Sequence, residues 1–242
     1  EIKTAQPVSG EITASVSVPK SVGSTRVDIP VSKPTGSMVA VIVHPDGTEE
    51  IVRGSVVTET GVALRAEGDV RLKVIDNAKR FNDMADHWAK DAVEFASSRE
   101  LFNGVGNGAF GPDRSMTRGM VSTVLARLAG ADTAGGETWY AKGTVWAVEN
   151  GITNGMTETT FAPDATCTRG QSVTFLHRAL KGTASGSTNF TDVKSDTFYA
   201  DAINWAVANN VTNGTSNTTF SPNADCTRAE IVTFLYRAYQ GK

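Results

Sequence analysis

The sequence predicts a multidomain protein: a small all-β, sandwich-like domain followed by an all-α bundle built from three repeats. Two observations lead to this fold class. The 242 residues change character near residue 78, from alternating or β-branched segments to segments with a helical period. Beyond that point, one pattern of punctuating residues occurs three times. We therefore expect two domains, at residues 1–78 and 79–242.

The composition is that of a folded globular protein. Hydrophobic residues make up 40% of the chain and charged residues 20%, which argues against wholesale disorder. The net charge of -3 and the lack of a basic stripe make nucleic acid an unexpected partner. No apolar run approaches the roughly 18 residues that span a bilayer, so we expect no membrane insertion. The chain starts at Glu1 without a Met or a signal-like segment, and we expect it to be a piece of a longer or processed protein.

Short strands account for residues 1–78. Runs at 12–18, 26–31 and 39–43 alternate or are β-branched, and Gly, Pro and Ser separate them. Pro45-Asp46-Gly47 is typical of a hairpin turn between 39–43 and 50–52. A further pair of strands is expected at 62–64 and 70–74. About six short strands predict a small antiparallel sandwich. No cluster of site-forming residues occurs in it, and we interpret it as a spacer, with an interaction domain as the alternative.

The repeats share an Asn-Gly pair, a Phe-x-Pro loop and a Thr-Arg pair at nearly constant spacing. The phenylalanines are Phe110, Phe161 and Phe220, and the arginines are Arg118, Arg169 and Arg228. Successive arginines are 51 and 59 residues apart, so the unit is about 50–60 residues long. We expect repeats at about 79–130, 131–183 and 184–242.

Each repeat is predicted to form a helix, a loop and a second helix. The first helix opens near an aromatic residue: Trp88, Tyr140 or Tyr199. It is expected to end at the Asn-Gly pair, where glycine adopts the left-handed conformation. The second helix begins at the threonine; Thr227 with Glu230, and Thr168 with Gln171, can form capping boxes. Since one helical pair cannot bury its apolar stripe alone, three pairs should pack around a shared axis.

These units resemble the S-layer homology module of bacterial surface proteins, over about residues 79–242. The resemblance rests on the Asn-Gly stop, the Phe-x-Pro loop, the Thr-Arg-Ala-Glu helix start, and openings at residues 81–84 and 190–193. It implies a pseudo-threefold, non-catalytic bundle that anchors proteins to secondary cell-wall polysaccharide, commonly through a pyruvylated N-acetylmannosamine unit. It also implies a secreted protein of the cell wall or S-layer of a Gram-positive bacterium. Copy two lacks a recognisable Phe-x-Asp-Val opening, so its groove need not be equivalent to the others.

Three arginines are the main candidates for binding an anionic ligand. Each follows a capping threonine, so it stands where helix amides and the positive end of the helix dipole lie. A guanidinium there can form a forked pair with a carboxylate, such as that of a pyruvyl ketal. We expect ligand binding by Arg118, Arg169 and Arg228 and by the capping Thr117, Thr168 and Thr227. The alternative is a structural role, in which each arginine ties its helix start to the preceding loop.

Two tryptophans in the first helices are candidates for stacking on a sugar. Trp146 and Trp205 are the residues concerned, although tryptophan at helical spacing belongs more often to a core. A second arginine triplet lies nine residues after the first, and we interpret it as complementing the negative helix ends. Its members are Arg127, Arg178 and Arg237.

We expect a monomeric binding module rather than an enzyme. No pair of acidic residues recurs with the arginines, and Glu230 is used by its cap. We expect no cofactor and no metal, and a wall polysaccharide as the partner. Two alternatives stay open: a fragment of a glycan-processing enzyme, and a self-assembly or protein-interaction module.

The two cysteines occupy one repeat position. Cys167 and Cys226 each precede the capping threonine, where the first copy has Met116. Methionine and free cysteine are both compact apolar fillers, so we expect buried, free thiols. We also expect the two positions to lie apart, because threefold-related positions in a bundle generally do.

Overall fold

The computed structural model describes residues 2–4, 12–183 and 186–240. The chain forms two compact units: residues 1–81 with 94–103, and residues 82–93 with 104–242. Helix α1 (Lys90–Ser98) therefore contributes residues to both units. The units are described separately below.

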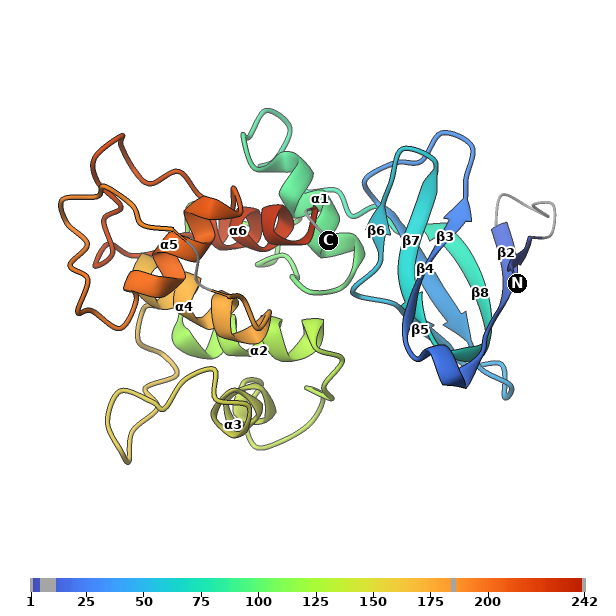
Figure 1. The fold of residues 1–242 in the computed structure, drawn as a ribbon, viewed down its shortest axis with the longest axis horizontal. Coiled ribbons are helices and arrows are strands. Elements are labelled where there is room, and N and C mark those ends of the chain that lie inside the picture. The colour runs from blue at the N-terminus through green and yellow to red at the C-terminus, as the bar shows by residue number, and fades with distance from the viewer. Residues whose placement is uncertain (1, 5–11, 184–185, 241–242) are drawn as a thin grey trace. The chain divides into compact units, whose positions relative to one another are not determined.

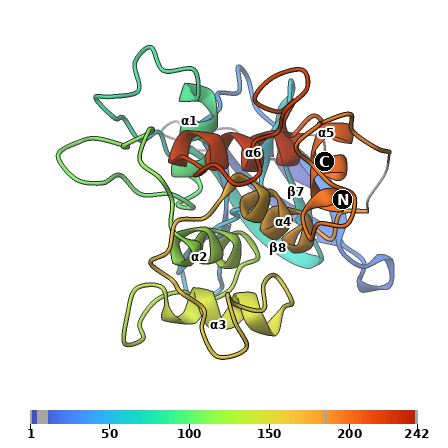
Figure 2. The same cartoon turned by 90° about the vertical axis from the view of Figure 1, so that its left-hand side faces the viewer.

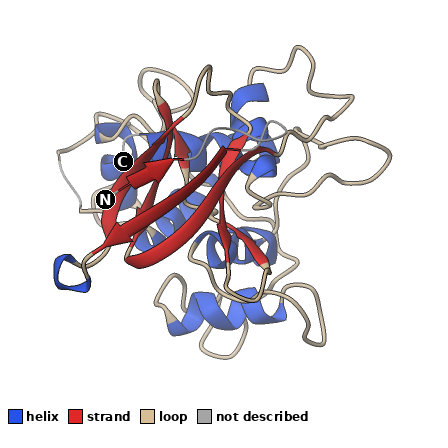
Figure 3. Ribbon diagram, turned by 90° about the vertical axis from the view of Figure 1, so that its right-hand side faces the viewer, coloured by secondary structure: helices blue, strands red, loops and turns tan. Residues whose placement is uncertain are grey.

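The first unit contains two antiparallel sheets, whose strands are red in Figure 3. The five-stranded sheet has the order β1-β2-β8-β4-β5, and the three-stranded sheet has the order β3-β7-β6. The strands of the larger sheet are β1 (Ile2–Thr4), β2 (Ile12–Val18), β8 (Gly68–Asp76), β4 (Met38–Val43) and β5 (Glu49–Ile51). Those of the smaller sheet are β3 (Thr25–Pro30), β7 (Gly61–Ala66) and β6 (Val56–Val57), and a 3-10 turn, η1 (Lys20–Val22), precedes β3.

The core of this unit draws on both sheets. Val16 and Leu72 from the larger sheet are buried in one cluster with Ile29 and Val62 from the smaller sheet. This burial follows from the alternation in the sequence: along β2, every second residue is buried and the others face solvent.

The hairpin predicted at residues 45–47 is confirmed. β4 and β5 pair antiparallel, with Val43 opposite Glu49, and Asp46 accepts hydrogen bonds from the amide and hydroxyl of Thr48. The further pair of strands also forms, as β7 and β8, but the two lie in different sheets. The chain crosses from one sheet to the other at Gly68, whose φ of 70° favours glycine.

A buried arginine holds the end of α1 in the first unit. Arg99 is fully buried and donates to the carbonyl oxygens of Ser55 (2.7 Å), Met38 (3.2 Å) and Phe95 (3.1 Å). Its guanidinium carbon also lies 4.0 Å from the centre of the Phe95 ring. These bonds explain why residues 94–103, which belong to the first repeat by sequence, are part of the β-rich unit.

The second unit is organised around the second helices of the three repeats (Figures 1 and 2). These are α2 (Arg118–Leu128), α4 (Arg169–Ala179) and α6 (Arg228–Gln240). Helix α4 contacts both α2 and α6, and apolar side chains from all three, among them Val124, Leu176 and Phe234, face one another. The first helices α3 (Ala141–Glu149) and α5 (Ala200–Ala208) pack against α2 and α4, respectively. The second helix of one repeat thus pairs with the first helix of the next.

The predicted starts of the second helices are confirmed. Each helix begins at the arginine, and the preceding threonine hydroxyl accepts a hydrogen bond from the amide three residues on. Both capping boxes form: the Thr168 amide donates to Gln171 (3.2 Å) and the Thr227 amide to Glu230 (2.9 Å).

The predicted ends of the first helices are wrong. Helices α1, α3 and α5 end at Ser98, Glu149 and Ala208, before the Asn-Gly pairs. The left-handed residues that follow them are Glu100, Gly151 and Asn210. The Asn-Gly pairs on which the prediction relied, at residues 103–104, 154–155 and 213–214, lie in the next loop, so they mark a turn rather than a helix end.

The predicted all-α class of the repeat region is also wrong, because this region mixes helices with short β-type pairing. The segments before the capping threonines are extended, with ψ near 163° at Thr117. They form isolated β-bridges between repeats: Ser115 with Thr227, Thr117 with Thr166, and Thr168 with Asp225. The backbone groups of these segments lie outside the helices, and their amides donate to carbonyl oxygens of the corresponding segments in other repeats.

Candidate functional site

A closed ring of backbone hydrogen bonds joins the three helix starts. The Met116 amide donates to the Cys226 carbonyl (3.0 Å), the Cys226 amide to the Cys167 carbonyl (3.1 Å), and the Cys167 amide to the Met116 carbonyl (2.8 Å). All three residues are buried, and both cysteines are free, as predicted. The expectation that the cysteines lie apart is wrong, since this ring places them side by side at the centre of the three repeats.

Each helix-start arginine reaches the Phe-x-Pro loop of another repeat. The Nε atom of Arg118 donates to the Phe161 carbonyl (2.9 Å), that of Arg169 to the Phe220 carbonyl (3.1 Å), and that of Arg228 to the Phe110 carbonyl (3.0 Å). Each guanidinium carbon lies 4.5–5.0 Å from the ring centre of the same phenylalanine. The three side chains are only 2–7% exposed. The arginines therefore link the repeats in a cycle, one to two, two to three and three to one.

The first amides of these helices are bonded to the same loops. The amides of Arg118 and Gly119 donate to the carbonyls of Ala165 (2.9 Å) and Pro163 (2.8 Å). The other two repeats make the equivalent bonds from Arg169, Gly170, Arg228 and Ala229. The helix-start amides that the sequence suggested for a ligand are thus already taken by the loops.

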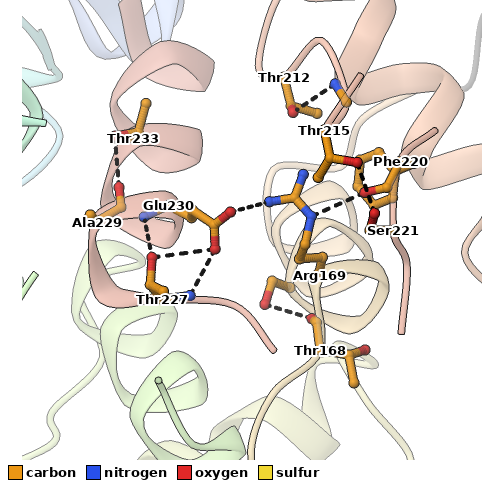
Figure 4. A network of polar contacts seen from close by, with 12 residues as sticks. Thr168, Arg169, Thr212, Thr215, Phe220, Ser221, Thr227, Ala229, Glu230 and Thr233 are labelled. Atoms are coloured by element: carbon orange, nitrogen blue, oxygen red, sulfur yellow. Dashed lines mark hydrogen bonds and ion pairs between the residues drawn. The ribbon is translucent and has the colours of Figure 1, made fainter. Parts of the chain in front are cut away.

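The three arginines differ in how their charge is balanced. Arg169 forms an ion pair with Glu230, the acidic member of the capping box (Figure 4). The equivalent of Glu230 is Gln171 in repeat two, so Arg118 has no acidic partner among the residues that the structure describes. Burial lowers the pKa of Arg118, and it lowers the pKa of Arg228 to about 10.

Two aspartates hold the Phe-x-Pro loops of repeats one and three. The carboxylate of Asp83 accepts from the amides of Phe110 (2.8 Å) and Gly111 (2.7 Å). Although burial alone would raise it, the pKa of Asp83 lies below its ordinary value because these two amides favour the ionised form. Asp192 accepts in the same way from Phe220 (2.9 Å) and Ser221 (2.7 Å). From the sequence, both residues belong to the repeat openings at residues 81–84 and 190–193, and this role was not predicted for them.

The two predicted tryptophans lie in different environments. Trp205 is 6% exposed, and its ring centre is 5.2 Å from that of His177, so it belongs to the core. Trp146 is half-buried on α3.

In the second arginine triplet, Arg178 donates to the Ile152 carbonyl (2.9 Å) and Arg127 to the Thr133 hydroxyl (3.3 Å).

The most exposed aromatic side chains were not predicted from the sequence as binding residues. Trp88, Trp139 and Phe198 are 64%, 53% and 62% exposed. Each contacts an aromatic neighbour just before a first helix, with ring centres 4.9–5.3 Å apart and the rings tilted or edge-on to one another. The signal that could have found them is the aromatic doublet at this position in every repeat: His87-Trp88, Trp139-Tyr140 and Phe198-Tyr199.

No described helix is long and apolar enough to cross a bilayer. The described residues contain no group of three His, Cys, Asp or Glu side chains placed to hold a metal ion.

The three helical repeats coincide with matches to one protein family. The S-layer homology domain matches residues 80–119, 133–171 and 189–232. The chain belongs to the S-layer homology domain family. The resemblance predicted from the repeat motifs is confirmed. The three S-layer homology (SLH) domains are a cell-wall anchoring module of the cell surface.

Several named relatives share these domains. The chain is 27% identical, over 96% of its length, to an amylopullulanase of Thermoanaerobacterium thermosulfurigenes. It is 38% identical, over 42% of its length, to a surface-layer 125 kDa protein of Lysinibacillus sphaericus, and 32% identical, over 47%, to a cellulosome-anchoring protein of Acetivibrio thermocellus. The chain spans only 13%, 9% and 29% of these three proteins.

Proposed function

We propose that this chain anchors a larger surface protein by binding secondary cell-wall polysaccharide through a pyruvylated N-acetylmannosamine unit, without cleaving it. One observation carries the proposal: relatives named as an amylopullulanase, a surface-layer protein and a cellulosome-anchoring protein share the SLH region over a small part of their length. A region common to proteins with such different names is what a portable anchor requires.

The site of binding is proposed at the three junctions between repeats. Arg118, Arg169 and Arg228, with the capping Thr117, Thr168 and Thr227, lie at these junctions, and the charge of Arg169 is balanced there by Glu230. Because these arginines are buried, we favour an electrostatic role over direct contact with the ligand at every junction. The field of a charge is screened less where the effective dielectric constant is low, so it extends further. Trp146 is partly exposed to solvent and could stack on a sugar, whereas Trp205 is almost fully buried.

We propose that residues 1–78 serve as a spacer and that the chain acts as a monomer without catalysis of its own. The three-domain ring is closed by its own hydrogen bonds, from repeat one to three and back. It needs no second copy to complete the junctions.

The test is co-sedimentation with purified Gram-positive cell walls that carry pyruvylated polysaccharide. The chain should sediment with intact walls, stay in solution once the wall polysaccharide has been stripped off, and release no reducing sugar. Equal sedimentation with stripped walls would contradict the proposed ligand. Release of reducing sugar would contradict the anchoring-only role.

A further inference from the structure

The Phe-x-Pro loops share one backbone conformation, which presents two successive amides. The residue after the phenylalanine is left-handed in each loop, with φ of 69° at Gly111, 54° at Ala162 and 59° at Ser221. In loops one and three, the two amides donate to the two oxygens of one carboxylate, Asp83 or Asp192. Concave pairs of backbone amides of this kind bind anions.

Loop two keeps the conformation but has no aspartate. Among the residues that the structure describes, the amides of Phe161 and Ala162 have no hydrogen-bond acceptor. Asp132, the acidic residue upstream, is bonded instead to the Ala134 amide (2.8 Å) and to Lys142. Ala162 adopts the left-handed conformation although it is not glycine. This conformation is energetically unfavourable for any residue that has a Cβ atom.

Loop two is also more open than the other two loops. Phe110 and Phe220 are fully buried, whereas Phe161 is only half-buried. In loop three, Phe190 covers the loop, with its ring centre 5.9 Å from that of Phe220. Repeat two lacks the Phe-x-Asp opening that would supply both the ring and the carboxylate. Its amides are therefore open to a group from outside the chain.

A buried positive charge stands behind loop two. Arg118 is 2% exposed, donates to the Phe161 carbonyl, and has no acidic partner among the described residues. A buried charge without a counter-charge is costly. At the next junction, Glu230 neutralises Arg169, so that loop three has both its own carboxylate and a balanced arginine. The junction of repeats one and two has neither.

We propose that loop two is a carboxylate-binding site, in which the amides of Phe161 and Ala162 hold one carboxylate of a ligand as Asp83 and Asp192 are held in the other loops. Arg118 supplies positive charge from behind the loop without touching the ligand. The carboxylate is one carried by the wall polymer, and this part of the inference rests on the proposed function. A free small carboxylate shares the same chemistry, and the second experiment separates the two sources.

The first experiment needs no wall polymer. Sodium acetate is titrated into the full chain, with sodium chloride at equal ionic strength as the control, and backbone amide resonances are followed by NMR. The resonances of Phe161 and Ala162 should move in a saturable way. Those of Phe110, Gly111, Phe220 and Ser221 should stay still, because they already have a carboxylate. Failure of Phe161 and Ala162 to move beyond the chloride control would overturn the site.

Two variants test, in the same titration, the roles of the loop carboxylate and of Arg118. Asp192→Ala removes the carboxylate from loop three, so the resonances of Phe220 and Ser221 should begin to respond to acetate. Gln171→Glu places an acid where Glu230 stands in repeat three, so it should neutralise Arg118 and weaken acetate binding at loop two by about tenfold. An unchanged affinity in a folded Gln171→Glu variant would remove Arg118 from the proposal. The titration of the original chain decides the site even if Asp192→Ala does not fold.

The second experiment tests the source of the carboxylate with a matched pair of variants. Asn and Asp both tolerate the left-handed conformation, so Ala162→Asn and Ala162→Asp differ mainly in charge beside the two amides. Binding to wall polysaccharide should fall about tenfold further in Ala162→Asp than in Ala162→Asn. Binding to polysaccharide whose carboxyl groups have been chemically reduced should be equally weak for both. Equal affinities for the intact polymer would overturn the polymer as the source.

The outcomes separate this inference from the proposed function. A chain that responds to acetate but does not sediment with walls retains the carboxylate site and contradicts the anchoring proposal. A chain that sediments with walls but shows no acetate response at Phe161 and Ala162 retains the anchor and contradicts the site.

Discussion

At the scale of single residues, the helix-start position has one geometry and three electrostatic environments. Arg118, Arg169 and Arg228 all donate to a phenylalanine carbonyl, yet only Arg169 has the ion pair with Glu230 shown in Figure 4. Glu230 also accepts from the Thr227 amide, so one carboxylate caps a helix and neutralises an arginine. Gln171 can perform only the first task.

We predict that Glu230→Gln keeps the cap and loses the ion pair. The buried Arg169 would then be without its counter-charge, and the free energy of unfolding should fall by about 1–3 kcal/mol. Urea denaturation of the two chains measures this difference. The reciprocal variant, Gln171→Glu, should raise stability by giving Arg118 a partner. An unchanged urea midpoint for Glu230→Gln would show that solvent screens the pair.

The two cysteines should be unreactive in the folded chain. Burial raises the pKa of the Cys167 thiol to about 11 and also raises that of Cys226, and the thiolate is the reactive form. A thiol reagent at pH 8 should therefore label the native chain slowly and label two thiols after denaturation. Finding none after denaturation without reductant would show that the adjacent cysteines had formed a disulfide.

The same burial predicts a loss of stability at alkaline pH. Below pH 9 both states keep the thiol protons. Between pH 9 and about 11 the unfolded chain releases a proton that the folded chain still holds at Cys167, so the unfolded state gains stability as pH rises. The urea midpoint should fall more between pH 8 and 10 in the original chain than in a chain with both cysteines replaced by alanine. An equal fall in both would assign the effect to other groups.

At the scale of elements, close contact between helices depends on one small residue. A Cβ atom on Gly143 in α3 would lie 2.7 Å from the Cα atom of Thr123 in α2. The backbones of α2 and α3 therefore approach too closely for any side chain at this position. This contact joins the second helix of repeat one to the first helix of repeat two.

We predict that Gly143→Ala destabilises the chain although alanine is the better helix former. The gain in helix propensity is at most about 1 kcal/mol, whereas overpacking costs about 1–3 kcal/mol. Thermal unfolding should show a lower midpoint. Val145→Ala is the matched control, because Val145 lies exposed on the same helix and should change the midpoint little. A higher midpoint for Gly143→Ala would mean that α3 can shift away from α2.

At the scale of the whole repeat ring, Arg228 closes the cycle. It joins repeat three to the Phe110 carbonyl, 118 residues away in the sequence. Phe110 is fully buried, so loss of the donor leaves a buried carbonyl with a poorer set of partners. The ring is thus held by contacts between its two ends as well as between neighbours.

We predict that Arg228→Ala weakens wall binding and stability more than Arg127→Ala, with a loss of about 1.5–3 kcal/mol. Arg228→Lys should recover little of this loss, because an ammonium group lacks the planar fork and stacks poorly on Phe110. Urea denaturation and wall co-sedimentation of the three variants should be measured together. Equal effects of Arg228→Ala and Arg127→Ala would contradict a special role for the helix-start position.

Local sequence patterns correctly predicted the structural features whose residues lie close together in the chain. The capping boxes at Thr168 and Thr227 and the turn at residues 45–47 need only side chains within four residues of the backbone groups that they bind. The ends of the first helices were missed because Glu100, Gly151 and Asn210 adopt the left-handed conformation directly after the helices, whereas the Asn-Gly pairs used for the prediction lie in the turns that follow. The long-range hydrogen bonds of Arg99 and Asp83 were missed because they join groups 27 to 63 residues apart in the sequence.

The sequence alone determined that three SLH repeats follow a β-rich segment and where each second helix begins, since periodicity, spacing and capping are local. Only the tertiary structure showed that the helix starts meet in one hydrogen-bonded ring and that each arginine binds another repeat's loop. It also showed that, within the described residues, loop two lacks the carboxylate present in loops one and three. The physical reason is that buried amides, carbonyls and charges must find partners wherever folding brings them. For Arg228 and Phe110, the partner is 118 residues away, and no local pattern encodes that distance.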